Sequence, residues 1–453
     1  MTITAPITPS KAFQRFTTPA VVSEMLRSYL PEFSNRSWEI RECAIGDTKL
    51  KTYLRPESKV KSTLSVCYQV TLREAATGES SRRILYAKMF LGGRSKEAFQ
   101  RLTDGGWTDS ELQQAITHVP DLDMILWRFP HDPGLPHLRH LMNLHAVREH
   151  LPAEGLRNLG MSGTPQVLAS HVVNYRPEIR CTNRYDLYDP HHDRASQLFG
   201  KTFRAGEGQA LSERLEYFWN RSLADPNAMA VAQPLGYAAP VNTVWQLGVP
   251  GMPLLQTLDR SNYEQYLASV SKGLASLHTS NVADLATHAP ADHIVEVRKK
   301  LLKLSDAIPR LAIDFEAMAD RLEQTAPHPS DIPFRPIHWD FHVHQLLACK
   351  GKLVFCDLDE LVIGDPVQDL ANFMVDLHFR NLDREFVRLM EGELYRSYRK
   401  QAEWNVPLER LAWHSRLQFV NKAYRSYLQF APDFEQTVEQ IFRLAAGDSL
   451  YVA

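Results

Sequence analysis

Apolar and polar residues alternate along the first part of the chain in the way that half-buried β-strands require. The alternation starts near Trp38, and apolar residues recur at every second position through several short runs. Between the last two runs, residues 73–83 are turn-rich and favour a hairpin loop. A glycine pair at positions 92 and 93 then opens a helical segment. The runs expected to be strands are 37–45, 51–56, 62–72 and 82–90.

The same order of landmarks occurs a second time, about a hundred residues further along the chain. An Arg-Pro-Glu tripeptide at 55–57 returns at 176–178, and the segment 85–93 resembles 198–206. We interpret the two stretches as two copies of one small antiparallel sheet followed by a helix. The matched positions are Lys88 with Lys201, Phe90 with Phe203, Gly93 with Gly206, and Trp127 with Trp245.

After Leu254 the pattern changes to apolar residues at three- and four-residue spacing, which predicts helices. No low-complexity tract separates the parts, so we expect them to pack together. An α+β fold of three units follows. These are an extra N-terminal α+β unit (1–150), a second sheet unit (151–253) and a mainly helical unit with a short catalytic stretch (254–453).

Composition narrows the function classes. The 453 residues are 44% hydrophobic and 23% charged with a net charge of −2, so no basic field favours nucleic acid or an anionic membrane. No apolar run is long enough for a membrane span or a signal peptide. The five cysteines are scattered and odd in number, which favours free thiols over disulfides or zinc. We expect a cytoplasmic protein.

One stretch, 336–373, carries the residue types of phosphoryl transfer. Gln345 follows Asp340 by five residues, and Asp357 follows on a strand-like run. In that chemistry one carboxylate orients the attacking hydroxyl, while an amide and a second carboxylate hold Mg²⁺ on the nucleotide phosphates. The spacing therefore favours a small-molecule kinase.

The motifs HWDFHVHQ (338–345) and CDLDELVIGDPVQDLA (356–371) resemble those of the aminoglycoside phosphotransferase and choline kinase family. The likeness extends over about residues 165–430. It implies a bilobal protein-kinase-like fold, with ATP and Mg²⁺ as cofactors and a small hydroxylated acceptor such as a sugar, aminosugar or aminoglycoside. Gln345 in place of the family's usual Asn is similar to the maltokinase branch, which also has an extra N-terminal domain. Trp339 stands where the family usually has Gly.

The resemblance implies a role for each residue of the stretch. Asp340 is the catalytic base or orienting group, and His338 fixes the loop by hydrogen bonding. Gln345 and Asp357 hold Mg²⁺. Asp359 points the same way as Asp357 on a strand and is expected either to assist the metal, to contact substrate or to be structural.

Lys201 is the expected phosphate-binding lysine, chosen over Lys88 because the second sheet leads directly into the helical unit that holds the catalytic stretch. Its expected partner is Glu213, with Glu216 and Glu207 as alternatives. Backbone groups of the hinge are expected to contact adenine. The hinge residues are Gln246, Gly248 and Val249.

Several alternatives stay open at this point. Asp365 is expected in a turn and Asp369 as an N-cap, both bracing the catalytic loop. Glu360 and Asp376, with Asp359, are candidates for binding a cationic or polyhydroxylated acceptor, or are plain solvated charges. The N-terminal unit shapes the acceptor pocket, mediates a homodimer or acts as a stabilising cap. The competing functions are an inactive pseudokinase that binds a partner and a zinc enzyme using His338, His342 and His344.

Overall fold

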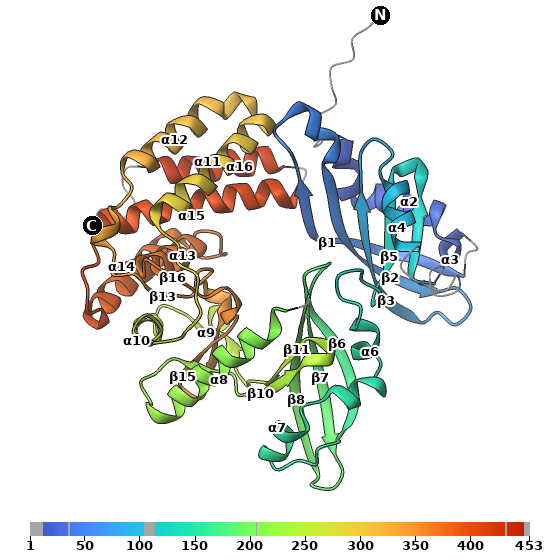
Figure 1. The fold of residues 1–453 in the computed structure, drawn as a ribbon, viewed down its shortest axis with the longest axis horizontal. Helices are drawn as coiled ribbons and strands as arrows, with labels where there is room; N and C mark the ends of the chain where they lie inside the picture. The colour runs from blue at the N-terminus through green and yellow to red at the C-terminus, as the bar shows by residue number, and fades with distance from the viewer. Residues whose placement is uncertain (1–11, 35–36, 104–113, 205, 431–432, 448–453) are drawn as a thin grey trace, which may run out of the picture.

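The computed structural model describes residues 12–34, 37–103, 114–204, 206–430 and 433–447. Its elements follow the expected order, with two antiparallel sheets before a largely helical part (Figure 1). The α+β class is therefore confirmed. Within the described residues no helix is both long and apolar enough to cross a membrane.

The first sheet has the strand order β1-β2-β3-β5-β4. Its strands are β1 (Trp38–Lys51), β2 (Thr63–Glu74), β3 (Ser80–Met89), β4 (Ile116–Val119) and β5 (Met124–Arg128), with helices α2 (Pro19–Tyr29), α3 (Pro31–Ser34) and α4 (Ser95–Thr103). The hairpin expected at 73–83 joins β2 to β3. The strand expected at 51–56 is wrong, because β1 ends at Lys51 and the chain turns into a 3₁₀ helix at Pro56–Lys61.

The second sheet has the strand order β10-β11-β8-β7-β6, which is the order of the first sheet read from the other edge. Its strands are β6 (Gln166–Arg176), β7 (Arg180–Asp189), β8 (Arg194–Phe203), β10 (Pro234–Ala238) and β11 (Thr243–Leu247). Helices α6 (Leu138–Met142) and α7 (Ala153–Asn158) precede it, and α8 (Gly208–Ala224) follows β8.

The two sheets share a specific turn. Asp123 before β5 and Asn242 before β11 both adopt left-handed backbone conformations, with φ of 49° and 46°. The carbonyl of Asp123 accepts from Phe90 N at 2.8 Å, and that of Asn242 accepts from Phe203 N at 3.1 Å. Their side chains in turn accept from the first backbone N–H of α4 and of α8. Phe90 and Phe203, which occupy matched positions in the repeated sequence landmarks, therefore donate equivalent backbone hydrogen bonds.

The helical part begins at the end of the second sheet. Its helices are α9 (Leu254–Thr257), α10 (Tyr263–His278), α11 (Pro290–Ala307), α12 (Ala312–Gln324), α13 (Val367–Leu377), α14 (Arg384–Gln401), α15 (Leu408–Gln429) and α16 (Phe434–Ala446). Short strands cross it and frame the catalytic stretch. They are β9 (Ala230–Val231), β12 (Met252–Pro253), β13 (Arg335–Ile337), β14 (Leu346–Cys349), β15 (Lys352–Phe355) and β16 (Val362–Gly364).

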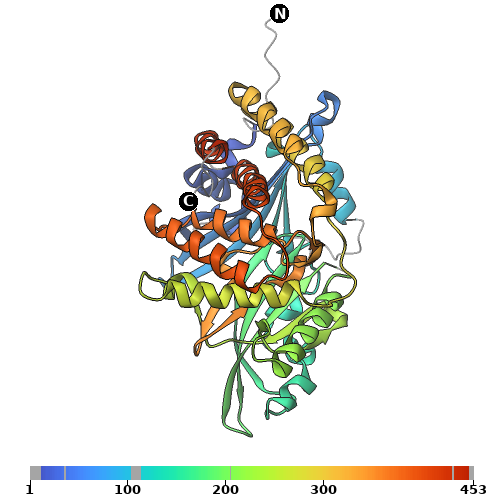
Figure 2. The ribbon, with the colours of Figure 1, turned by 90° about the vertical axis from the view of Figure 1, so that its left-hand side faces the viewer.

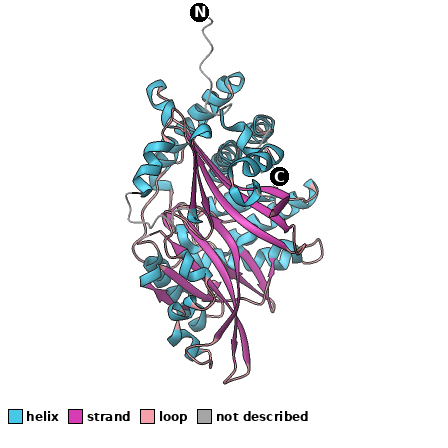
Figure 3. Cartoon of the chain, turned by 90° about the vertical axis from the view of Figure 1, so that its right-hand side faces the viewer, coloured by secondary structure: helices cyan, strands magenta, loops and turns pink. Residues whose placement is uncertain are grey.

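The apolar core does not stop at the borders of these parts. One continuous cluster joins residues of the first sheet, such as Val66 and Leu126, to residues of α11 and α15, such as Leu301 and Leu417. Figure 2 shows the blue strands against the red C-terminal helices, and Figure 3 shows the long strands of the two sheets flanked by helices. A second cluster packs α8, α10, α13 and α14 around Phe341 of the catalytic stretch. The start and the end of the chain therefore share a core.

Candidate active site

The catalytic stretch is held by one buried carboxylate. Asp369 lies in the first turn of α13 and is fully buried. It accepts hydrogen bonds from the backbone N–H of His338 at 2.7 Å and of Trp339 at 3.0 Å, and its third partner is His278 at 3.1 Å. His338 is also buried, and its Nε2 donates to the carbonyl of Cys356 at 3.0 Å. Both residues therefore position the loop, as the resemblance implied.

The expected N-cap role of Asp369 is wrong, because α13 begins at Val367 and Asp369 already lies inside it. Asp365 takes the capping contact, accepting from Val367 N at 3.1 Å. It also pairs with Arg410 and His414 at 3.0 Å each. The cationic partners and the cap outweigh burial, so the pKa of Asp365 lies below its ordinary value.

Trp339 adopts a backbone conformation that favours glycine, with φ of 74°. Its ring stacks on His293 with centroids 5.3 Å apart and lies 4.5 Å from His288. Its carbonyl accepts from Asn372 Nδ2 at 2.5 Å. Aromatic packing and α13 therefore hold an L-residue in a conformation that costs about 1–2 kcal/mol.

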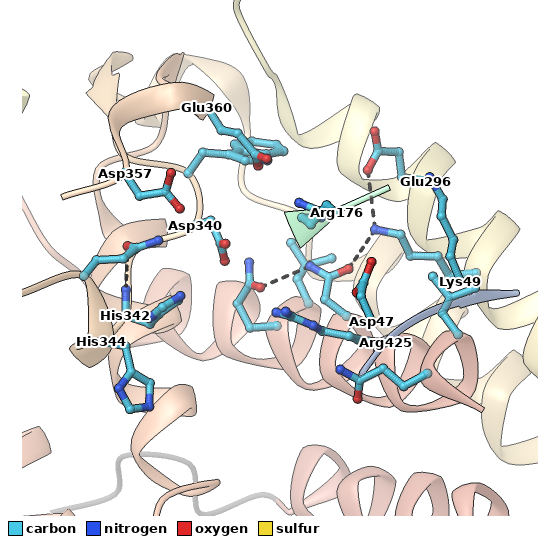
Figure 4. Close-up of a pocket in the computed structure, with 18 of the residues that line it drawn as sticks. Asp47, Lys49, Arg176, Glu296, Asp340, His342, His344, Asp357, Glu360 and Arg425 are labelled. Carbon is cyan, nitrogen blue, oxygen red and sulfur yellow. Dashed lines mark hydrogen bonds and ion pairs between the residues drawn. The ribbon is translucent and has the colours of Figure 1, made fainter. Parts of the chain in front are cut away.

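Asp340, Gln345 and Asp357 line one cavity of about 660 Å³. Asp357 follows β15 and turns the chain with a φ of 62°. Gln345 is buried, with its side-chain oxygen accepting from His342 N at 3.3 Å. Its backbone carbonyl accepts from Cys356 N at 2.8 Å, which ties the loop to the segment after β15. The three residues expected to orient the acceptor and hold the metal are thus brought together, and Figure 4 shows Asp340 beside Asp357.

Lys201 reaches this site from β8. Its ammonium nitrogen lies 2.5 Å from both Asp357 Oδ1 and Asp359 Oδ2. Arg180, at the start of β7, approaches the same carboxylates at 3.7 Å and 2.7 Å. Burial raises the pKa of Asp357, but Lys201 and Arg180 outweigh it and lower the pKa to about 2. Burial dominates at Asp359 and raises its pKa.

The expected ion pair between Lys201 and Glu213 is not formed. The core-facing residues of α8 include Leu211, Leu215 and Phe218, and Glu213 projects from the opposite, exposed face. There its carboxylate accepts from Gln209, one turn earlier on the helix. The alternatives Glu207 and Glu216 are exposed as well. The carboxylates of Asp357 and Asp359 occupy the place that a helix glutamate was expected to take.

The hinge differs from expectation at Gly248. Its N–H donates to the carbonyl of Gln197 at 2.7 Å, and a side chain there would collide with that carbonyl. Glycine thus allows close approach between two backbone segments, and this N–H is engaged within the protein. Gln246 lies in β11 opposite Phe199, and the carbonyl of Val249 accepts from Gly251 N at 2.8 Å.

The residues present fit a hard divalent cation better than a transition metal. The described part of the chain contains no cluster of three or more His, Cys, Asp and Glu side chains with metal-binding geometry. His338, which the zinc alternative requires, instead donates to the Cys356 carbonyl. Asp359 shares Lys201 with Asp357, and its buried Oδ1 makes no hydrogen bond. Two or three oxygen ligands completed by phosphate and water are the usual Mg²⁺ arrangement.

Some cavity residues were absent from the sequence-based site. Asp47 and Lys49 come from β1 of the N-terminal unit, Arg176 from β6, and Lys300 and Arg425 from α11 and α15. Only Arg176 carried a sequence signal, as part of the repeated Arg-Pro-Glu landmark. The others meet through tertiary packing.

Of the three carboxylates considered for a cationic acceptor, only Glu360 lines the cavity. Asp359 is paired with Lys201 and Arg180. Asp376 is buried and paired with Arg380 and Lys422, at 2.7 Å each. Burial and then the nearby Asp340 raise the pKa of Glu360.

Residues 186–404 match the profile of the phosphotransferase enzyme family, APH. This match confirms the resemblance, since both motifs and Lys201 lie inside it. Over this span the chain is therefore similar to phosphotransferases. No protein in a search of curated sequences matches the chain.

Three of the solved structures that this chain is similar to are the following. A putative aminoglycoside phosphotransferase from Ralstonia eutropha is 14% identical, with 66% of this chain and 93% of that chain covered and a TM-score of 0.48. A thermostable mutant of aminoglycoside phosphotransferase APH(4)-Ia is 16% identical, with coverage of 66% and 100% and a TM-score of 0.45. Choline kinase LicA from Streptococcus pneumoniae is 14% identical, with coverage of 66% and 98% and a TM-score of 0.43.

Proposed function

We propose that the protein transfers the γ-phosphoryl group of ATP to a hydroxyl of a small molecule. Sugars, aminosugars and aminoglycosides form the broad acceptor class. The observation that carries this proposal is the convergence of Asp340, Gln345 and Asp357 on one cavity, with Lys201 beside Asp357. These are the groups that phosphoryl transfer requires, at positions set by rigid elements.

The roles follow from the contacts. Asp340 orients the acceptor hydroxyl and takes its proton as the oxygen attacks phosphorus. The bond between the γ-phosphorus and the bridging oxygen breaks, and ADP leaves. Lys201 neutralises phosphate charge, while Gln345 and Asp357 would hold Mg²⁺, which would neutralise further charge on the phosphates. Asp359 shares Lys201 with Asp357, so it keeps the ammonium group near the phosphates.

The three units take different parts in this proposal. Residues 151–253 bind the nucleotide against Lys201 and the hinge, and residues 254–453 supply the catalytic stretch. Residues 1–150 form a degenerate copy of the nucleotide-binding sheet. In this copy Lys88 pairs with Glu178 of the second unit, at 2.9 Å. The five cysteines are free, which supports a reducing, cytoplasmic location.

A substrate panel tests the proposal. Purified protein with ATP and Mg²⁺ is expected to phosphorylate at least one sugar, aminosugar or aminoglycoside, measured by ADP release and by mass increase of the acceptor. The Asp340→Asn variant is expected to bind ATP normally and to lose about 100-fold or more in kcat. Full activity of this variant contradicts the mechanism. ATP binding without turnover of any acceptor favours the alternative, a non-catalytic pseudokinase, to which the strained Trp339 points.

A further inference from the structure

The cavity that holds the catalytic residues extends to the N-terminal unit. Asp340 and Asp357 lie on one side of it, and Asp47, Lys49 and Arg425 lie on the other (Figure 4). Asp47 sits at an irregularity in the pairing of β1 with β2, between Ile45 and Thr48. This irregularity interrupts the regular ladder and brings the β1 backbone to the cavity beside α15. The wall far from the catalytic carboxylates is therefore built by β1, α11 and α15.

This far wall presents hydrogen-bond donors. Lys300 donates to Asn421 Oδ1 at 2.8 Å, and Asn421 Nδ2 donates to Gln418 Oε1 at 3.1 Å. The chain of bonds uses the oxygen of each amide, which leaves the Gln418 amide N–H groups as donors toward the cavity. Gln418, Asn421 and Arg425 lie three and four residues apart, so they share one face of α15.

Some charged groups on this wall have a partner of opposite charge, and others do not. Lys300 has an acidic neighbour in Glu296, at 3.5 Å. Within the described residues, the side chains of Lys49 and Arg425 make neither an ion pair nor a hydrogen bond. Burial lowers the pKa of Lys300 despite Glu296, so an added negative charge would favour its protonated form. The acidic groups of this wall are Asp47 and Glu296.

This wall offers few free carboxylates to a polycationic acceptor. On the wall itself Glu296 is engaged by Lys300, which leaves Asp47, and elsewhere Asp359 and Asp376 are neutralised within the protein. A ligand rich in acceptor oxygens meets the free donors of Lys49, Arg425 and Gln418 instead. Guanidinium and ammonium groups bind carboxylate and phosphate oxygens in this way.

We propose that the acceptor is a polyhydroxylated molecule that carries an anionic group, held by Lys49 and Arg425 while its hydroxyl meets Asp340. This inference rests on the proposed function and names the substrate class of the same site. The N-terminal unit is then part of the acceptor site, with Lys49 as its specificity residue. A carboxylate and a phosphate ester share the required chemistry.

Four matched ligands test this inference: glucose, glucosamine, glucuronate and glucose 6-phosphate. Calorimetry on the full chain, with and without a non-hydrolysable ATP analogue, is expected to show binding of one or both anionic ligands that weakens with salt. Arg425→Ala and Lys49→Ala are expected to weaken that binding at least 10-fold. The matched controls, Arg388→Ala on exposed α14 surface and Arg41→Ala on β1, are expected to leave it unchanged.

Each outcome decides between possibilities. Binding of glucuronate alone identifies the anionic group as a carboxylate. Binding of glucose 6-phosphate alone identifies it as a phosphate ester. Three results would overturn the inference. They are preferential binding of glucosamine, an equal loss of binding in the control variants, and no binding of either anionic ligand. Failure of the proposed function has a different signature, since anionic-ligand binding then persists without ATP binding or phosphoryl transfer. Unfolding curves that match the wild type exclude misfolding of the variants.

Discussion

The ammonium nitrogen of Lys201 lies 2.5 Å from Oδ1 of Asp357, joining β8 of the second sheet to the turn after β15. This contact links the expected phosphate-binding residue directly to the expected metal ligand. It spans the two parts of the chain between which a nucleotide binds in the proposed function.

Replacing Lys201 by Ala is expected to lower kcat/KM for ATP by about 100-fold or more, because the phosphate charge loses its closest cation. Lys88→Ala is the matched control, since Lys88 occupies the corresponding position of the first sheet and pairs with Glu178. It is expected to leave ATP kinetics unchanged and to cost at most about 1 kcal/mol of stability, because the pair is partly exposed. Steady-state kinetics with the best acceptor measure kcat/KM for ATP in both variants. The reverse result would assign the nucleotide to the first sheet.

Two substitutions at one position separate backbone strain from packing at Trp339. Trp339→Gly and Trp339→Ala both remove the ring from His288 and His293, but only glycine adopts a φ of 74° without strain. The Gly variant is therefore expected to be more stable than the Ala variant by about 1 kcal/mol. Urea denaturation with a common slope measures the difference. An Ala variant of equal or greater stability would contradict this account of the loop.

His293 is expected to make stability depend on pH. Burial, with His414, His288 and Lys300 nearby, lowers its pKa to about 3, against an ordinary value of 6.5. Between these values the unfolded chain binds a proton that the folded protein does not, so the free energy of unfolding falls as the pH drops below 6.5. The slope from this residue is at most about 1.4 kcal/mol per pH unit. Chemical denaturation from pH 7.5 to 5.0 measures it, and His293→Gln is expected to flatten the curve. An unchanged slope in that variant would assign the effect to other groups.

Asp369→Asn is expected to lower kcat without changing the affinity for ATP. An amide has one acceptor oxygen, so it cannot serve the N–H groups of both His338 and Trp339 on its two sides. Stability is expected to fall by about 1–3 kcal/mol because a buried donor loses its partner. Activity assays and calorimetry with ATP separate the two effects. Asp314→Asn, on the exposed face of α12, is the control for a changed charge.

The sequence could predict that Asp340, Gln345 and Asp357 lie together, because they fall within one short segment with the residue types and spacing that phosphoryl transfer requires. Their roles stay a prediction. The pairing of Lys201 with Glu213 failed for a local reason. The apolar residues Leu211, Leu215 and Phe218 set the rotation of α8 and turn Glu213 to solvent.

The far wall of the cavity could not be predicted in the same way. Lys49 and Arg425 are almost the whole chain apart, and neither belongs to a motif. They meet because β1 packs beside α15, and this packing depends on the combined burial of many apolar side chains rather than on local pattern. The repeated landmarks predicted that a second sheet exists, but not where it docks.

The apolar cluster that joins the first sheet to α11 and α15 has a consequence for biosynthesis. The strands β1 to β5 leave the ribosome well before Leu417 and Val420, which complete their core and lie about 290 residues further along the chain. At ordinary translation rates the interval is on the order of tens of seconds. During that time one face of the nascent sheet stays uncovered, so the N-terminal unit is expected to need chaperone protection until α15 has been made.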